Sequence, residues 1–322
     1  MMRFLLVVFP LLFACSLGIG EGKKDPEPAF RVVGYLFSPS DWKAGLEAID
    51  WSLYTDVCLA FIQPDENGDF APNPVYKEIV NAAHQRGARV FVSIGGGEPP
   101  EYLPSLMRAE KREYWVEQLA ALVSRYGFDG VDVDLENALI NEDYAPFVKV
   151  LSHRLKQAGK RMTAALAAWN GDAIPDEVLA LYDWVNLMSY DDTGPWNLEK
   201  PGQHAPFEMA VSDIRYYRDQ RRVPVDKIIL GLPFYGYGFG PGAPPNLRYR
   251  HILERFPSAY LQDSLVMPEG GVLYYNSPAL IRKKTQLAKE LGLGGVMVWH
   301  IQADSNGENS LRNAIRSELD QE

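Results

Sequence analysis

The chain has 322 residues, of which 47% are hydrophobic and 23% are charged, and its formal net charge is −10. This composition is typical of a soluble globular protein with one large domain or two ordinary ones, not of a disordered chain. The acidic balance provides no basic surface for phosphates, so we expect neither nucleic acid nor an anionic membrane surface as a partner. The only two cysteines, Cys15 and Cys58, belong to no CxxC motif or Cys/His cluster, which excludes a disulfide framework and a cysteine-held zinc site.

The N-terminus predicts export. Residues 4–14 form an apolar run that is too short to span a bilayer and resembles the core of a secretory signal. The run ends in the letters LFAC, which resemble a bacterial lipobox, where the signal is cut just before a cysteine and its thiol is acylated. We therefore expect residues 1–14 to be a signal peptide and residues 15–29 to be a tether lipidated at Cys15. The protein would then be a cell-envelope lipoprotein held to a membrane by its lipid alone, and the alternative is an ordinary secreted protein.

After the tether, short apolar runs alternate with longer amphipathic segments, which is the rhythm of βα units. The runs are residues 31–37, 56–62, 89–94, 128–136, 161–167, 184–190, 227–232 and 295–299. Their near-continuous Val, Ile, Leu and Ala content predicts parallel strands that are buried on both faces. The clearest helix is predicted over residues 110–126, where Trp115, Leu119, Leu122 and Tyr126 share one face.

Eight βα pairs predict an α/β protein with a single (β/α)8 barrel over residues 30–322. The rival is a doubly wound open sheet, which would need a glycine-rich fingerprint after its first strand. The sequence Gly34-Tyr35-Leu36-Phe37 offers none, so the barrel is preferred.

The chemistry is concentrated in the fourth apolar run, FDGVDVDLE. Because side chains alternate along a strand, Asp132, Asp134 and Glu136 share one face. Three acids so close together force at least one proton to be retained and raise a pKa. A carboxyl group that is protonated near neutrality can act as a general acid, and Glu136 is nearest the C-terminal mouth, where barrel active sites lie. We count Asp129, in the same run, among the acids that serve catalysis.

Other interpretations of the acidic run are weaker. A calcium-binding EF-hand loop needs glycine at its sixth position, which is Asn137 here. A salt-bridge cluster is disfavoured because no Lys or Arg occurs in the run after Phe128 or in the ten residues that follow it. The five histidines form no metal-binding motif, so we expect neither a metal nor another cofactor.

At this point the sequence resembles a known family. Residues 129–136 match the D-G-x-D-x-D-x-E signature of glycoside hydrolase family 18, which contains chitinases and some endo-β-N-acetylglucosaminidases. Residues 93–96 look like its S-x-G-G motif, residues 188–191 its M-x-Y-D motif, and Trp299 its tryptophan on the eighth strand. The resemblance extends from Phe30 to the C-terminus.

The resemblance implies a mechanism and a role for each site residue. A retaining glycosidase normally has a second carboxylate about 5 Å from the acid, but this family instead uses the 2-acetamido carbonyl of the sugar as the nucleophile. Glu136 would protonate the leaving oxygen and later activate water, while Asp134 would orient the acetamido group. Asp132 would share its proton with Asp134, and Ser93 and Tyr35 would support that buried acid. The remaining implied residues are Tyr190 on the acetamido oxygen, Trp299 as the floor, and Asp191, Met188, Phe61, Gly95 and Tyr235 around the substrate.

The sequence is compatible with several glycans as the substrate. The resemblance implies cleavage of β-1,4 linkages of N-acetylglucosamine in chitin or chito-oligosaccharides. The alternatives are the chitobiose core of N-glycans, a peptidoglycan-derived glycan, and a non-catalytic lectin, against which the retained Glu136 argues. Residues 240–276 look too few for the large α+β subdomain that deepens the cleft of many family members, so we expect an open cleft and a monomer. The last crossover helix is predicted to begin near Ser277.

Overall fold

The computed structural model describes residues 28–38, 40–47 and 49–321. The predicted signal peptide and the lipid-attachment residue Cys15 lie outside the described residues. Within the described part of the chain, no helix is long and apolar enough to cross a membrane.

Eight parallel strands close into a barrel, which confirms the predicted fold class. Around the barrel the order is β1, β12, β7, β6, β5, β4, β3 and β2. The strands are β1 (Arg31–Phe37), β2 (Asp56–Ala60), β3 (Arg89–Gly96), β4 (Gly130–Leu135), β5 (Arg161–Leu166), β6 (Trp184–Leu187), β7 (Ile228–Pro233) and β12 (Gly295–Trp299). Each of the eight predicted apolar runs supplies one of these strands.

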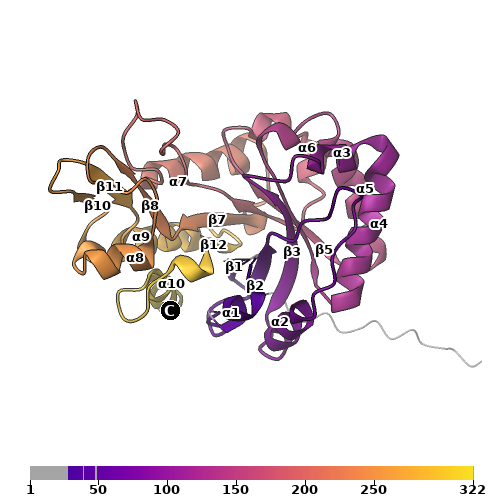
Figure 1. The fold of residues 1–322 in the computed structure, drawn as a ribbon, viewed down its shortest axis with the longest axis horizontal. Coiled ribbons are helices and arrows are strands. Elements are labelled where there is room, and N and C mark those ends of the chain that lie inside the picture. Colours follow the sequence, from indigo (N-terminus) through magenta and orange to yellow (C-terminus); the bar gives the residue numbers. More distant parts are fainter. Residues whose placement is uncertain (1–27, 39, 48, 322) are drawn as a thin grey trace, which may run out of the picture.

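Helices flank the barrel, with α2 to α5 on one side of it in Figure 1. They are α1 (Trp42–Glu47), α2 (Val75–His84), α3 (Leu103–Met107), α4 (Ala109–Tyr126), α5 (Tyr144–Gln157), α6 (Asp176–Leu179), α7 (Phe207–Arg215), α9 (Pro278–Glu290) and α10 (Leu311–Leu319). Short helical turns are η1 (Asn137–Leu139), η2 (Gly171–Ala173), η3 (Tyr216–Gln220), η4 (Val225–Lys227), η5 (Ala259–Leu261) and η6 (Ile301–Ala303). The helix predicted over residues 110–126 is α4, and Gly127 ends it in the left-handed conformation, with φ 78°.

The interval after β7 carries more structure than the sequence suggested. It was expected to hold no large subdomain, and it holds a small one: β8 (Tyr235–Phe239), β9 (Leu247–Arg248), α8 (Tyr249–Arg255), β10 (Ser264–Val266) and β11 (Val272–Tyr275). The four strands form an antiparallel sheet in the order β10, β11, β8, β9. Since β8 begins just after β7 ends, this sheet stands at the C-terminal rim of the barrel. Figure 1 shows it, with α8, as a lobe beside the barrel. The expected open cleft therefore has a wall on this side.

Large side chains fill the barrel interior at one end, and the acidic side chains of β4 lie toward the other end. Near the N-terminal ends of the strands the interior is filled by large side chains, with the rings of Phe91 and Trp184 in edge contact at 5.3 Å between centroids. The guanidinium of Arg31 lies 4.2 Å from the centre of the Trp184 ring and covers it. Cys58 is fully buried in the same interior cluster, as a small hydrophobic residue. This layer fills the interior at the N-terminal ends of the strands. The acidic side chains of β4 follow it toward the C-terminal ends, where the barrel opens.

Candidate active site

Asp132 is a fully buried carboxylate that neighbouring strands hold in place. The strand register sets Ser93 of β3 and Thr163 of β5 opposite it. Both hydroxyl groups donate to Asp132, at 2.8 Å to Oδ2 and 2.6 Å to Oδ1 respectively. Tyr35 donates to Oδ2 at 2.7 Å, and the Asn186 amide donates to Oδ1 at 3.1 Å. Burial raises the pKa of Asp132, and these hydrogen bonds oppose that rise.

Asp134 and Glu136 continue the row toward the mouth and share a hydrogen bond. Asp134 is buried, and its Oδ1 has no hydrogen-bond partner among the described residues. Burial raises its pKa well above the usual range, and the charges of Glu136 and Asp132 raise it further. Burial raises the pKa of Glu136 to about 7, and the charge of Asp191 adds to the rise, while the hydrogen bond from Asp134 opposes it. The pair therefore retains a proton near neutral pH, as general-acid chemistry requires.

A second group of polar residues faces this pair from the end of β6. Asp191 has a left-handed backbone, with φ 67°. Its Oδ1 accepts a hydrogen bond of 2.5 Å from the Tyr235 hydroxyl and lies 3.3 Å from Nδ1 of His204. His204 is completely buried, and its Nε2 lies 3.3 Å from the carbonyl oxygen of Tyr235. The carboxylate of Asp191 and the carbonyl oxygen of Tyr235 thus face the two ring nitrogens of His204 and fix the orientation of the ring.

Tyr190 and Met188 lie on the same side of the barrel. The Tyr190 hydroxyl is 4.0 Å from the sulfur of Met297, and its ring makes an edge contact with that of Tyr235. Burial and the charge of Asp134 raise the pKa of Tyr190, so its hydroxyl stays protonated and can donate a hydrogen bond. Met188 is half-buried against the interior cluster.

Trp299 forms an aromatic floor with three other rings. Its ring stacks on Phe61 with centroids 5.8 Å apart and meets the edge of Tyr35 at 5.6 Å. Phe37 packs against it at 5.6 Å. Because Trp299 is only partly buried, part of its indole surface is available to stack against a sugar ring.

Three of the predicted substrate-binding residues lie behind this surface. Tyr35 and Ser93 are fully buried and contact Asp132. Gly95 has φ 99°, and a Cβ at this position would collide with the backbone oxygen of Asp134. Gly95 therefore allows the close approach of β3 to β4. Its backbone N–H donates to the Gln63 side chain, whose amide donates in turn to the Gly95 carbonyl.

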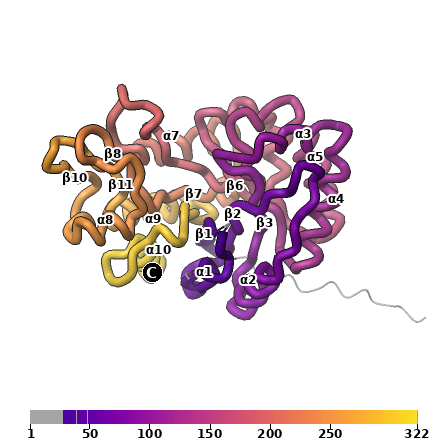
Figure 2. Tube along the Cα trace, in the orientation of Figure 1, coloured from indigo at the N-terminus to yellow at the C-terminus, as the bar shows by residue number. Residues whose placement is uncertain are grey.

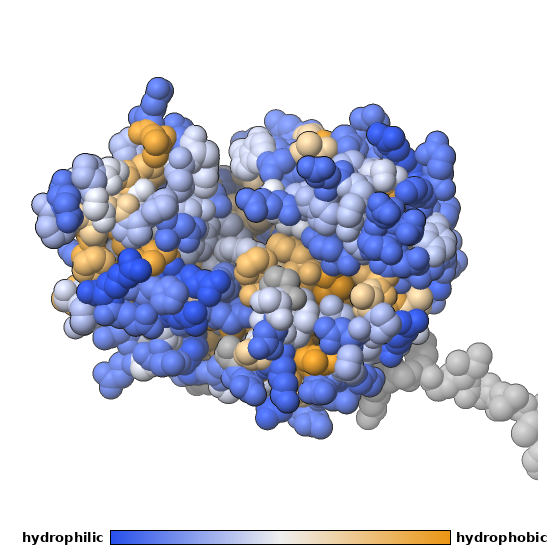
Figure 3. All heavy atoms as spheres, in the orientation of Figure 1, coloured by the Kyte–Doolittle hydropathy of each residue, from blue (hydrophilic) through white to orange (hydrophobic). Residues whose placement is uncertain are grey.

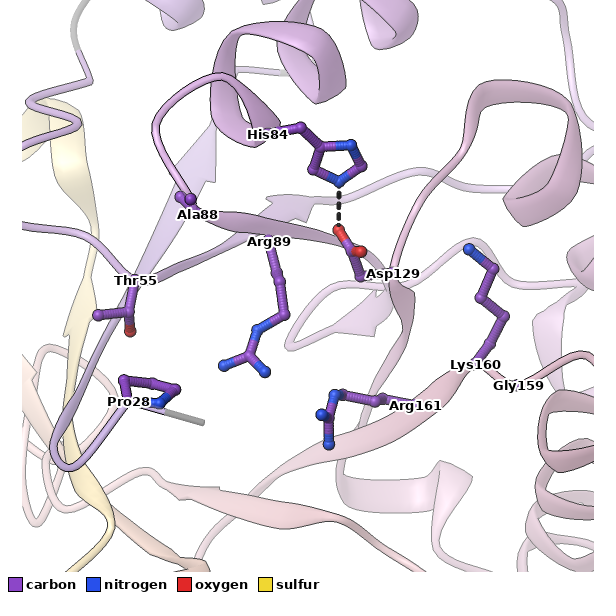
Figure 4. A pocket seen from close by; sticks show the side chains of 10 residues that line it. Pro28, Thr55, His84, Ala88, Arg89, Asp129, Gly159, Lys160 and Arg161 are labelled. Carbon is purple, nitrogen blue, oxygen red and sulfur yellow. Dashed lines mark hydrogen bonds and ion pairs between the residues drawn. The ribbon is translucent and has the colours of Figure 1, made fainter. Parts of the chain in front are cut away.

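The inclusion of Asp129 among the catalytic acids was wrong. This residue precedes β4 and so lies at the opposite, N-terminal end of the barrel. Its Oδ2 is 2.9 Å from Nε2 of His84 and accepts the backbone N–H of Val90. Figure 4 shows Asp129 in a pocket there, with Arg89, Lys160 and Arg161 around it.

A cleft of about 1190 Å³ opens next to Glu136 and Asp191. Figure 3 shows a hollow between the lobe that carries the small sheet and the rest of the molecule. Trp169 and Trp196, two exposed tryptophans, line the cleft. The ring of Trp196 contacts that of Tyr237 on β8, and Figure 2 shows the chain between β6 and α7 rising beside β8.

Several residues of the site were missed at the sequence level, namely Trp169, Trp196, His204, Thr163 and Asn186. A signal existed for the two tryptophans, because each follows the C-terminal end of a predicted strand, where the binding loops of this fold lie. The structure also shows that no group of three or more His, Cys, Asp or Glu side chains among the described residues could hold a metal ion.

A closed parallel barrel with a row of acids at its C-terminal mouth is the arrangement of a (β/α)8 enzyme whose carboxyl groups perform acid–base chemistry. The sequence profile of Glycosyl hydrolases family 18 matches residues 31–304. The chain therefore belongs to glycosyl hydrolase family 18.

Individual relatives agree with this assignment. The crystal structure of the family 18 chitinase ChiB from Flavobacterium johnsoniae is similar with a TM-score of 0.81 and 31% identity, covering 90% of this chain and 93% of that one. An endochitinase of Brugia malayi is 26% identical and covers 84% of this chain and 68% of that protein. A probable chitinase 10 of Drosophila melanogaster is also 26% identical, but the chain spans only 15% of that much longer protein.

Proposed function

We propose that this protein hydrolyses β-1,4 linkages in chitin or chito-oligosaccharides with retention of configuration. The observation that carries the proposal is the pair formed by Asp134 and Glu136, which retains a proton at the mouth of a family 18 barrel. The names of the relatives, which are chitinases, support chitin as the substrate class.

The residues of the site divide the chemistry in the way the family implies. Glu136 donates its proton to the glycosidic oxygen while the 2-acetamido carbonyl of the sugar attacks the anomeric carbon, so the leaving group departs and an oxazolinium ion remains. Asp134, lying beneath Glu136, orients the acetamido group and stabilises its positive charge. Tyr190 donates to the acetamido oxygen, and Glu136 then takes a proton from the water that opens the ring.

We propose a glycan chain as the ligand of this site, with its sugar rings stacked on exposed aromatic side chains. Trp299 offers an apolar face beneath the reacting sugar, and the exposed rings of Trp169 and Trp196 offer further faces along the cleft. Sugar rings stack on such surfaces through their C–H faces, while the acids and amides of the cleft bond to the hydroxyl groups.

Parallel assays on three substrates test the proposal. Purified protein is incubated with chitotetraose, with a high-mannose glycoprotein and with glycan strands from peptidoglycan, and products are separated by mass spectrometry. We expect cleavage of chitotetraose by the native protein and none by Glu136→Gln. Cleavage of the glycoprotein alone would replace the chitinase assignment with endo-β-N-acetylglucosaminidase activity. Binding of chitotetraose without cleavage of any substrate would favour a lectin.

We further propose that the protein is an exported monomer anchored by lipid at Cys15. The apolar segment and the LFAC letters support this proposal. Expression with isotope-labelled palmitate should label the native protein and leave Cys15→Ser unlabelled. Absence of label from the native protein would favour simple secretion, and light scattering of the barrel should give a monomer mass.

A further inference from the structure

A second pocket, of about 730 Å³, adjoins the aromatic floor. Phe37 and Gln302 line it, and the Phe37 ring also packs against Trp299. Gln302 fixes this edge because its side chain bonds to both the backbone N–H and the carbonyl of Phe37. Phe37 therefore joins this pocket to the aromatic floor on which the proposed glycan would lie.

Two arginines from the small lobe, Arg248 of β9 and Arg250 of α8, line the same pocket. Both are half-buried, and neither forms an ion pair with a carboxylate of the described residues. The Nε of Arg250 donates to Nε2 of His251 at 3.2 Å, which orients its guanidinium. Figure 3 shows strongly hydrophilic surface where Figure 1 places α8, beside the hollow.

Three acids and a third arginine, Arg312, also line the pocket, but none of these acids forms an ion pair with Arg248 or Arg250. Asp50 pairs with Arg316 at 2.9 Å and with Arg312 at 3.9 Å. The buried carboxylate of Asp304 accepts backbone N–H bonds from Ser305, Leu311 and Arg312. The remaining acid is Glu47, which is exposed on α1 and forms no ion pair with either pocket arginine.

The two arginines repel each other and disfavour a positive charge on His300. Burial and the nearby charge of Arg250 lower the pKa of Arg248. Burial lowers the pKa of His300, the residue after Trp299, to about 4, and the charges of both arginines contribute. Holding two like charges close together and partly out of water costs free energy unless an anion lies between them. In a chain with a net charge of −10, this pair without an acidic partner is the feature that needs a function.

We propose that Arg248 and Arg250 form a subsite for an acidic substituent, a carboxylate in the first instance, on the glycan that occupies Trp299. The planar fork of a guanidinium matches the two oxygens of a carboxylate, and bonds between two charged groups are stronger than neutral ones. The enzyme would then prefer a chitin-type glycan that carries acidic groups over the neutral polymer. This inference rests on the proposed function, because it assumes that the glycan binds along Trp299.

The test compares neutral chitohexaose with 6-O-carboxymethylated chitohexaose. Binding is measured by calorimetry on Glu136→Gln protein, with and without the double substitution Arg248→Gln/Arg250→Gln. We expect tighter binding of the carboxylated oligomer, a preference about tenfold smaller after the double substitution, and weakening of that preference at high salt. Arg255→Gln is the matched control, because Arg255 is an exposed arginine of α8 that does not line the pocket.

Three results would overturn the inference. The first is the same preference for the carboxylated oligomer in the proteins with and without the two arginines, and the second is an equal loss of affinity for both oligomers. The third is full competition by free acetate. Hydrolysis of neutral chitohexaose by the native protein is measured separately, so failure of the proposed function is distinguished from failure of the subsite. Free acetate serves as a competitor and should not reproduce the effect of the tethered carboxylate; full competition by acetate would show a site for small anions and refute a glycan subsite.

Discussion

Replacing Glu136 by glutamine should abolish turnover and at the same time stabilise the protein above neutral pH. Glutamine has the same shape but carries neither a transferable proton nor a charge. Loss of a general acid lowers kcat by about 10²–10⁴-fold, and loss of the base for the second step adds to this. The stability gain has a different origin, the cost of ionising a carboxyl group in a mostly buried position.

The size of that gain follows from the pKa of Glu136, which rises from 4.5 to about 7 on folding. One pKa unit corresponds to about 1.4 kcal/mol, so the shift sets an upper limit of about 3 kcal/mol. Because the carboxylate is partly reached by solvent and shares a proton with Asp134, we expect about 1–2 kcal/mol. In a barrel of this size this corresponds to a Tm increase of about 2–5 °C.

The stability difference between the native protein and Glu136→Gln should depend on pH. A carboxyl group whose pKa is raised on folding binds more protons in the folded state between pH 4.5 and about 7. The native protein therefore loses stability as pH rises through this window, while Glu136→Gln does not lose this contribution. The difference in Tm should be small at pH 5 and complete at pH 8.

Thermal unfolding followed by circular dichroism at pH 5 and pH 8 measures this difference. Glu254→Gln is the matched control, because Glu254 is an exposed acid of α8 and its replacement should shift Tm little at either pH. A Tm difference between native protein and Glu136→Gln that is the same at both pH values, or a lower Tm for the variant at pH 8, would refute the reasoning.

Three further predictions concern the groups around the acids. Thr163→Val removes one hydroxyl donor from buried Asp132 and should lower the free energy of unfolding by about 1–3 kcal/mol in urea titrations, with a loss of activity. Asp191→Asn removes a charge that raises the pKa of Glu136, so the alkaline limb of the kcat/KM profile should move to lower pH. Trp169→Ala removes a ring that is 70% exposed, so Tm should change little while KM for chitohexaose rises about 5–10-fold.

Each of these predictions has a control in the same chain. Thr285→Val loses a hydroxyl bond to a carbonyl of its own helix α9 and should leave activity intact. Asp192→Asn changes the exposed neighbour of Asp191 and should shift the pH profile less. Tyr114→Ala removes an exposed ring of α4 outside the cleft and should leave KM unchanged. Equal effects of a substitution and its control would contradict the corresponding prediction.

Much of the barrel could be predicted because strands buried on both faces carry a near-continuous apolar sequence. Alternation along β4 also places Asp132, Asp134 and Glu136 in one row, and the structure shows their raised pKa values. The same alternation explains why Asp129 does not belong to the row: its odd position puts it on the other face, and it precedes the first residue of the strand.

The small lobe was missed because its strands are only two to five residues long and because β8, with the sequence YGYGF, alternates tyrosine with glycine, so none of them shows the long apolar run of a barrel strand. The lobe forms one wall of the cleft and supplies Tyr237 to it, and it supplies Arg248 and Arg250 to the second pocket. It also supplies Tyr235, whose hydroxyl donates to Asp191. No local pattern could reveal that these side chains lie beside the end of β1 and the segments that follow β6 and β12.

By itself the sequence determined the fold class, the row of acids and the family, because each depends on local periodicity or on short motifs. Only the tertiary structure decided which residues surround that row. The four donors to Asp132 and the two arginines near His300 come from segments far apart in the chain, and the contact of His204 with Asp191 is made between two residues of one long loop. Such contacts depend on how the barrel closes and how its loops pack, and the resulting burial and charge set the pKa values on which catalysis depends.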